Sequence, residues 1–223
     1  MAKILKQQTS LDSTGNQKIL LAVVLLIAGL LFLEHNALIG LGMLVGGIYI
    51  GKNGLAFKTG AAGEEDVTDL LEYMPKDWYV FNDMIVGSSQ IDHIVVGSKG
   101  VYTIETKNYQ GTIYGNAEKM QWKQVFSNGS SFEFYNPVKQ GNKHSLELSK
   151  FLEENGLKTW VTTLVVFPHK DVELKVWSPK TRVLYLNELA AYFMEQKDVL
   201  DKEACDLIVE KLKEIVPENN SAQ

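Results

Sequence analysis

Two apolar arms near the N-terminus constrain this chain more than any other feature. Residues 19–33 and 37–50 are uninterrupted apolar sequence, and the polar triplet Glu34-His35-Asn36 separates them. About 20 apolar residues are needed to cross the core of a bilayer, so each arm is short for a full span. A single span is disfavoured, because it would place the charge of Glu34 at mid-membrane. The pattern predicts a hydrophobic helical hairpin, either as two thin spans or as a shallow re-entrant loop.

The charges beside the arms predict the orientation of this hairpin in a cell membrane. Glu34 is the one charge between the arms, and lysines flank them on both sides: Lys3, Lys6, Lys18, Lys52 and Lys58. By the positive-inside rule, both ends of the hairpin lie in the cytoplasm. A cleaved signal peptide is the weaker alternative, because the leading segment is long and polar and no small-residue cleavage site clearly follows the first arm.

The second arm is rich in glycine. The pairs Gly42/Gly46 and Gly47/Gly51 have the small-xxx-small spacing that lets two helices approach closely. They serve either the hairpin itself or a homo-oligomer formed through this helix. Glycine is also common in membrane helices generally, which accounts for the pairs equally well.

The rest of the chain divides by composition. We predict a polar N-terminal segment (1–18), the membrane hairpin (19–50), a linker (51–59), one domain (60–216) and a disordered polar tail (217–223). Within the domain, a helix from Thr59 or Gly60 precedes several strands, a helix over 137–154, and further strands and helices. This order predicts an α/β fold with a central mixed β-sheet flanked by helices. The single cysteine, Cys205, excludes an internal disulfide and a cysteine-based zinc cluster.

Residues 90–107 carry the chemistry. Two strand-like runs meet at a tight turn at Lys99-Gly100, and the second run ends in Glu105-Thr106-Lys107. Strand residues two apart share a face, so Glu105 and Lys107 project to the same side. In an antiparallel hairpin Asp92, near the start of the first run, lies opposite Glu105. Carboxylates inside apolar strands are unusual unless paired or bound to metal, and phosphodiester hydrolysis needs such a site.

Several further motifs occur in a fixed order around this segment, and together they resemble the nuclease-related domain (NERD), a branch of the PD-(D/E)xK nuclease superfamily. The resemblance covers residues 60 to about 151, somewhat under half of the chain. The stretches that carry it are Gly60-Ala-Ala-Gly-Glu-Glu65, Gln90-Ile-Asp-His93, Gly100-Val-Tyr-Thr-Ile-Glu-Thr-Lys-Asn108, Gly111-Thr-Ile-Tyr-Gly115, Trp122 and Asn136-Pro-Val-Lys-Gln140.

The resemblance implies a restriction-endonuclease-like core and a set of active-site residues: Glu64, Asp92, Glu105, Lys107 and Gln140. Glu65 is the alternative to Glu64, and the Gly-Glu spacing favours Glu64. We expect Mg²⁺ or Mn²⁺ bound by Asp92 and Glu105, with the backbone carbonyl of Thr106, and by Glu64 directly or through water. Lys107 would position the attacking water and steady charge on the phosphate, with Gln140 orienting either one.

Charge sets a limit on the substrate. The chain has 22 basic and 27 acidic residues, and five basic and two acidic ones precede Gly60, which leaves 17 basic and 25 acidic residues in the domain. So acidic a domain is not a strong non-specific binder of nucleic acid. A local groove is the alternative, from lysines that lie near the site in sequence, interleaved with Trp122 and Phe126: Lys119, Lys123, Lys139 and Lys143. His93 is either a neighbour of the metal ligands or a packed side chain.

Two functions follow. The first is a membrane-anchored, metal-dependent nuclease that hydrolyses DNA or RNA. The second is a non-catalytic membrane-bound module that uses the nuclease fold to bind nucleic acid or protein. The full set of five active-site residues favours the first, and the acidic surface favours the second. A glycosidase with Asp92 and Glu105 as acid and base is disfavoured by Lys107 and the metal-site spacing.

Overall fold

The structure is a computed structural model that describes residues 1–5 and 10–216. It falls into two units. The helical unit ends at Ala62, and the α/β unit combines the N-terminal strand with the residues from Gly63 onward. The predicted tail, 217–223, lies outside the described residues.

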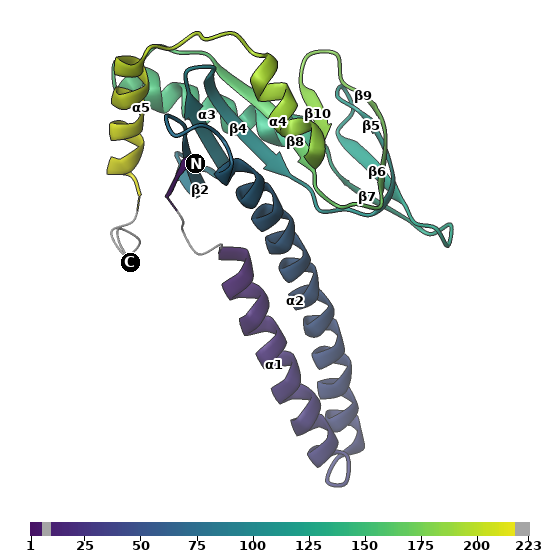
Figure 1. Cartoon of the computed structure of the whole chain (residues 1–223). Helices are drawn as coiled ribbons and strands as arrows, with labels where there is room; N and C mark the ends of the chain where they lie inside the picture. The colour runs from purple at the N-terminus through teal and green to yellow at the C-terminus, as the bar shows by residue number, and fades with distance from the viewer. Residues whose placement is uncertain (6–9, 217–223) are drawn as a thin grey trace. The chain divides into compact units, whose positions relative to one another are not determined.

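The helical unit is an antiparallel hairpin of α1 (Ser10–Phe32) and the first part of α2 (Ala37–Glu72) (Figure 1). The side chain of Asn36 accepts hydrogen bonds from the backbone N–H groups of Leu38 (3.2 Å) and Ile39 (3.3 Å), so it caps the start of α2. Both helices are long and apolar enough to cross a membrane. The expected linker at 51–59 is instead the middle of α2, which runs without a break into the helix expected from residue 60.

Small residues line the contact between the two helices. A Cβ atom added at Gly40 would lie 2.8 Å from the carbonyl oxygen of Gly29. One added at Gly47 would lie 3.1 Å from that of Ala22, and one at Gly54 would lie 3.1 Å from that of Gly15. These residues recur with heptad spacing on each helix, and we call them the glycine seam. Gly54 therefore stays helical despite its low propensity, since only glycine permits this approach.

Of the two predicted small-residue pairs, only Gly47/Gly51 lies at the contact between the helices. Gly47 and Gly51 face α1, with an added Cβ at Gly51 lying 3.4 Å from Ala22 Cβ. Gly42 and Gly46 have open space around them and do not contribute to the hairpin contact. A homo-oligomer through this helix stays a prediction.

The α/β unit contains two sheets, where the sequence predicts one. Sheet A has the order β1-β2-β3-β4-β8-β10, and sheet B has the order β7-β6-β5-β9. The strands of sheet A are β1 (Lys3–Leu5), β2 (Tyr79–Val86), β3 (Ser89–Gly97), β4 (Gly100–Thr106), β8 (Val161–Phe167) and β10 (Arg182–Tyr185). Those of sheet B are β5 (Gly111–Asn116), β6 (Gln121–Val125), β7 (Ser131–Tyr135) and β9 (Val172–Trp177). The core is a mixed α/β fold with helix-flanked sheets, as predicted.

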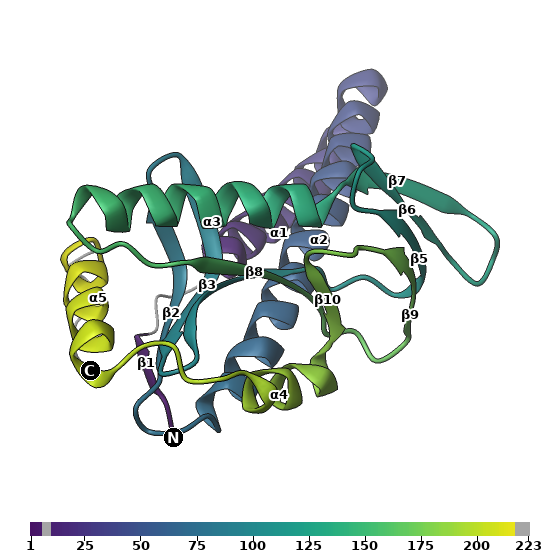
Figure 2. The same ribbon diagram turned by 90° about the horizontal axis from the view of Figure 1, so that it is seen from above.

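Helices cover both faces of sheet A (Figure 2). On one face, α3 (Pro137–Glu154) and α5 (Lys202–Glu214) bury Leu148, Leu152 and Ile208 against β2, β3 and β4. On the other, the C-terminal end of α2 and α4 (Leu186–Glu195) bury Leu71 and Phe193. The central strands of sheet A are therefore buried on both faces, and a polar side chain within them needs a partner.

The N-terminal strand is the largest departure from the predicted domain boundaries. Residues Lys3–Leu5 pair in parallel with Tyr79–Phe81, so β1 is an edge strand of sheet A. The hairpin is thus an insertion between two adjacent strands of one sheet. Three residues are too short a run to be read as a strand from their pattern.

Three local features differ from what the sequence pattern suggests. The dipeptide Asn82-Asp83, which is typical of a turn, lies inside β2, where Asp83 has the positive backbone angle φ 53°. The β3–β4 turn consists of Ser98 and Lys99, since Gly97 pairs with Gly100. The region after Val125 contains the strand β7. Only Phe134 of that strand is buried, so its sequence shows no clear alternation of apolar and polar residues.

Candidate active site

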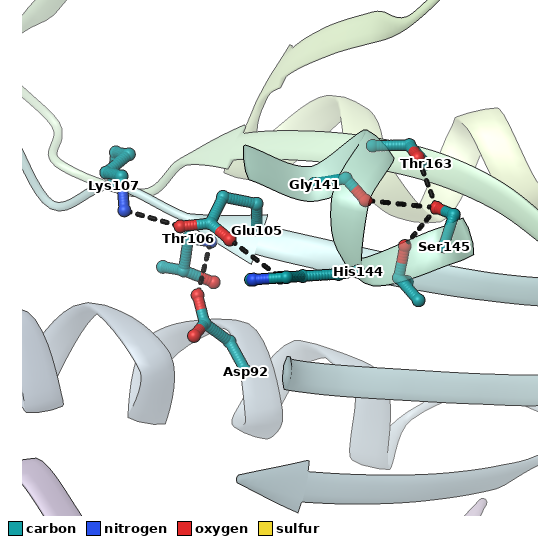
Figure 3. A network of polar contacts seen from close by, with 9 residues as sticks. Asp92, Glu105, Thr106, Lys107, Gly141, His144, Ser145 and Thr163 are labelled. Atoms are coloured by element: carbon teal, nitrogen blue, oxygen red, sulfur yellow. Dashed lines mark hydrogen bonds and ion pairs between the residues drawn. The ribbon is translucent and has the colours of Figure 1, made fainter. Parts of the chain in front are cut away.

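Glu105 is the centre of the polar cluster on sheet A. It lies near the C-terminal end of β4 and is 1% exposed. Its Oε1 atom accepts a hydrogen bond from Lys107 Nζ, and its Oε2 atom lies 3.2 Å from Nδ1 of His144 on α3 (Figure 3). The carboxylate thus lies between the cation of Lys107, directly after β4, and an imidazole on the covering helix.

Asp92 reaches this cluster from β3, and the hairpin register is the one expected from the sequence. The β3–β4 ladder ends at the pair His93↔Ile104, so Asp92 and Glu105 occupy the next position on each strand. Asp92 Oδ2 accepts a hydrogen bond of 2.8 Å from the backbone N–H of Thr106. That bond ties the first carboxylate to the strand that carries the second.

Two further acids contribute to the field of the site. Glu64, on α2, is buried, and so is Asp83 on β2. The pairs Asn82↔His93 and Met84↔Ile91 flank Asp83 and Asp92, which leaves these two acids at matching positions of adjacent strands. Nothing in the sequence pattern marked Asp83, because Asn-Asp is a typical turn dipeptide.

The clustering of these acids raises the pKa values of two of them, Glu64 and Asp92. Burial, Asp83 and Glu105 together raise the pKa of Glu64 to about 7. Burial, Glu105 and Glu64 raise the pKa of Asp92 well above its usual range. Burial alone would lower the pKa of Lys107, but the charges of Glu105 and Asp92 outweigh it and raise that pKa. Lys107 is therefore a charged ammonium. Its single positive charge does not balance the negative charge that the neighbouring carboxyl groups would carry if all were ionised.

Helix α3 is fixed over Glu105 by its cap and by a close approach. The Asn136 side chain accepts from Val138 N (2.9 Å) and donates to the backbone oxygen of Lys119 (2.7 Å), which anchors the helix start. A Cβ added at Gly141 would lie 2.6 Å from Thr163 Cγ2, so α3 can lie this near β8 only with glycine there. Ser145 Oγ then bonds Thr103 Oγ1 at 2.7 Å and also contacts Thr163.

The five predicted site residues do not all meet. Asp92, Glu105 and Lys107 lie together, and Glu64 acts on them electrostatically. Gln140 is half-buried on α3, and its side chain makes no hydrogen bond or ion pair within the described residues. His144, which the sequence reasoning missed, lies one helical turn after Gln140; that spacing on a predicted helix is the signal that could have found it.

The donor set fits a divalent cation by its chemistry. Carboxylate oxygens are the preferred ligands of Mg²⁺ and Mn²⁺, and a cation would relieve the mutual repulsion of Asp92, Glu105 and Glu64. Glu105 Oε2 is also buried without a hydrogen-bond partner among the described residues. In that same part of the chain, no three or more His, Cys, Asp or Glu side chains are arranged to hold a metal ion. Binding would thus require some of these side chains to move.

Two other candidate residues belong to the core. His93 is fully buried, its Nδ1 lies 2.9 Å from Asn82 Oδ1, and burial lowers its pKa to about 3, so it is a neutral packed side chain. Trp122 is 2% exposed and packs against Phe134 and Phe167, so it cannot stack on a base as part of a lysine groove.

Comparisons with known proteins identify the family of the domain. The model of the nuclease-related domain (NERD) family matches residues 59–168. An uncharacterized protein of Bacillus anthracis, pXO1-01, is 35% identical over 150 residues, which cover 63% of this chain and 68% of that protein. The chain belongs to the nuclease-related domain family. This match extends beyond the resemblance predicted from the motifs, through β8 to the loop that follows it.

Among solved structures, the chain is similar to Pyrococcus furiosus SfsA in complex with Ca²⁺. The sequence identity is 16%, and the TM-score is 0.25. The alignment covers 69% of this chain and 52% of the SfsA chain, so the chain spans about half the length of that protein. A likeness this low carries no inference about fold or function.

Proposed function

We propose that this protein is a membrane-anchored, metal-dependent nuclease that hydrolyses phosphodiester bonds of DNA or RNA. The observation that carries the proposal is the hydrogen-bonded ion pair between Lys107 and the buried carboxylate of Glu105. The register of β3 and β4 places Asp92 opposite Glu105. An ion pair buried in a sheet contributes little to stability, because desolvation offsets the attraction. We therefore attribute this cluster of carboxylates and a lysine to catalysis and not to stability.

Each residue has a distinct task in this proposal. Asp92 and Glu105, with Glu64, would hold Mg²⁺ or Mn²⁺, which when bound polarises the phosphate and supplies the positive charge that hydrolysis requires. Lys107 donates to the scissile phosphate or its attacking water, since its raised pKa keeps the ammonium charged. Thr106 N–H orients Asp92. Gln140 would turn toward the substrate from its half-buried place on α3.

The test of the chemistry is Lys107→Met in the full chain, purified in detergent. Methionine keeps the length of the side chain and removes its charge. We expect single-turnover cleavage in Mn²⁺ to fall by about 100-fold or more, the range for loss of one transition-state donor. Binding of the same nucleic acid in Ca²⁺ should change by less than about threefold. The exposed Lys213→Met, on α5, is the matched control and should cleave normally.

The opposite result favours the second candidate, a non-catalytic membrane module. Support for that candidate comes from the acidic balance of the domain and from the absence, among residues 1–5 and 10–216, of a ready three-residue metal cluster. Wild-type protein that binds nucleic acid but cleaves no DNA or RNA with any divalent cation would establish it in place of the nuclease.

The membrane part of the proposal rests on the apolar helices and on β1. Because β1 and β2 are neighbours in sheet A, the chain before the hairpin and the chain after it belong to one folded unit. Both therefore lie on the same side of a bilayer, which agrees with two crossings and with the lysine distribution. A cysteine placed at His35 should react with an impermeant thiol reagent on intact cells, and one at Lys180 should not. The native Cys205 is buried. Labelling at Lys180 would refute the cytoplasmic assignment.

A further inference from the structure

Two buried polar atoms of the site lie within ion-pair distance of each other but form no hydrogen bond. Glu105 Oε2 and His144 Nδ1 are 3.2 Å apart, yet neither forms a hydrogen bond within the described part of the chain. The side chains are 1% and 8% exposed, so bulk water does not reach them freely. Buried polar atoms are nearly always hydrogen-bonded, so these two atoms are candidate ligands for one group that would satisfy both.

The separation of the two atoms fits a shared cation. Two ligand atoms that each lie about 2.1 Å from one metal ion, at right angles, are about 3.0 Å apart. A direct N–H···O bond is the competing account, but it requires the ring N–H to point at the oxygen, and no such bond is formed. In a shared coordination shell both atoms point at the metal and not at each other.

The surrounding contacts hold this pair in place. Lys107 occupies Oε1 of Glu105, so the orientation of the carboxylate is fixed and Oε2 is the atom left for another ligand. On the other side, the Gly141 contact with Thr163 and the Ser145 hydroxyl bonds fix α3 on the sheet. Figure 3 shows the imidazole beside the carboxylate, with Asp92 approaching the same point from β3.

We propose that His144 Nδ1 and Glu105 Oε2 are two ligands of one divalent transition-metal cation, so that the site selects Mn²⁺ or Co²⁺ over Mg²⁺. The proposal rests on the proposed function, because it concerns the metal of that same site. Imidazole nitrogen binds these cations well and binds Mg²⁺ poorly, since Mg²⁺ prefers oxygen. The role requires a neutral imidazole with its proton on Nε2. Asp92 and Glu64, which interact electrostatically with Glu105, would have to move to complete the shell, since no three such side chains in the described residues are arranged to hold a metal ion.

The direct test detects nitrogen bound to the metal. Mn²⁺ is added to the full chain in detergent, without a histidine tag, and pulsed electron paramagnetic resonance measures coupling to ¹⁴N. We expect the ¹⁴N coupling of one imidazole in wild-type protein. His144→Asn should lose it and weaken Mn²⁺ binding by about tenfold or more, whereas Mg²⁺ binding should change by less than about threefold. His169→Asn, on the loop after β8, is the matched control and should keep both.

The wild-type spectrum decides the question even if a variant fails to fold. Mn²⁺ that binds without ¹⁴N coupling, or with coupling that persists in folded His144→Asn, would overturn the role of His144 and leave the nuclease proposal intact. If no divalent cation binds and no nucleic acid is cleaved, both proposals fall together. A Mn²⁺-to-Mg²⁺ affinity ratio that His144→Asn leaves unchanged would overturn the selectivity.

Discussion

The helical hairpin and the acidic site solve opposite packing problems. In the glycine seam two helix backbones approach so closely that a Cβ atom added at Gly40, Gly47 or Gly54 would lie within 3.1 Å of a carbonyl oxygen of the other helix. In the site, side chains with charge are brought together inside a sheet buried on both faces. The side chains that the helix contact can accept are limited by their volume, and those that the site can accept are limited by their charge. Substitutions that change one property and keep the other should therefore have contrasting effects in the two places.

The largest effect should come from removing charge at constant shape. Glu105→Gln keeps the volume but loses the carboxylate that binds Lys107 and the expected metal. We expect cleavage by the full chain to fall by about 1000-fold, equivalent to about 4 kcal/mol in the barrier. Leu148→Met, a volume-conserving change in the buried face of α3, should cleave within about twofold of wild type. Equal losses in the two variants would show that packing, not charge, limits the site.

The next effect should come from adding volume to the glycine seam. Gly40→Leu places a side chain against the backbone of Gly29 and Leu33, where even Cβ would lie at 2.8 Å from neighbouring atoms. We expect it to destabilise the hairpin by about 3 kcal/mol. Gly42→Leu, two residues away and with open space around it, is the matched control. Thermal unfolding in detergent compares them. Similar melting temperatures would contradict the seam.

A smaller effect should follow the protonation of Glu64. Its pKa is about 7 in the folded chain against an ordinary 4.5, so the folded state holds the proton more tightly. The free energy of unfolding should therefore fall as the pH rises from 4.5 to 7 and level off above 7. With metal removed by chelation, we expect wild type to lose about 2 kcal/mol between pH 5 and pH 8. Glu64→Gln should lack this loss, and Glu65→Gln, at an exposed position, should retain it.

The smallest effect should come from a neutral polar contact beside the site. Ser145→Ala removes the hydroxyl that Thr103 and Thr163 share and leaves α3 otherwise intact. We expect a loss of about 1 kcal/mol in the free energy of unfolding. Cleavage should stay within about threefold, because no charge is lost. A loss of cleavage as large as that of Glu105→Gln would mean that the position of α3 matters as much as the carboxylate.

The sequence predicted most strongly those features that local rules determine. The β3–β4 register followed from side-chain alternation and a short turn, and α3 followed from Asn136, Pro137 and an apolar stripe. The continuity of α2 was missed because Asn53 and Gly54 are helix-weakening residues, and the compensating contact of Gly54 with α1 is not local.

The remaining site features depend on long-range packing. His144 approaches Glu105 only because α3 lies across β4 and β8, and Asp83 joins the cluster only through the pairing of β2 with β3. Sheet B was missed as a separate sheet because β5 pairs with β9, a strand far along the chain. No window of sequence contains both partners of such contacts.

The pairing of β1 with β2 has a consequence for how the protein is made. During synthesis β1 leaves the ribosome before the two apolar helices, but its partner β2 emerges only after both of them. The edge of sheet A therefore stays incomplete while the hairpin emerges, and the α/β unit closes only after both helices have been made. For the proposed membrane anchor, this order of segments would make insertion of the hairpin an early step and completion of the sheet a late one.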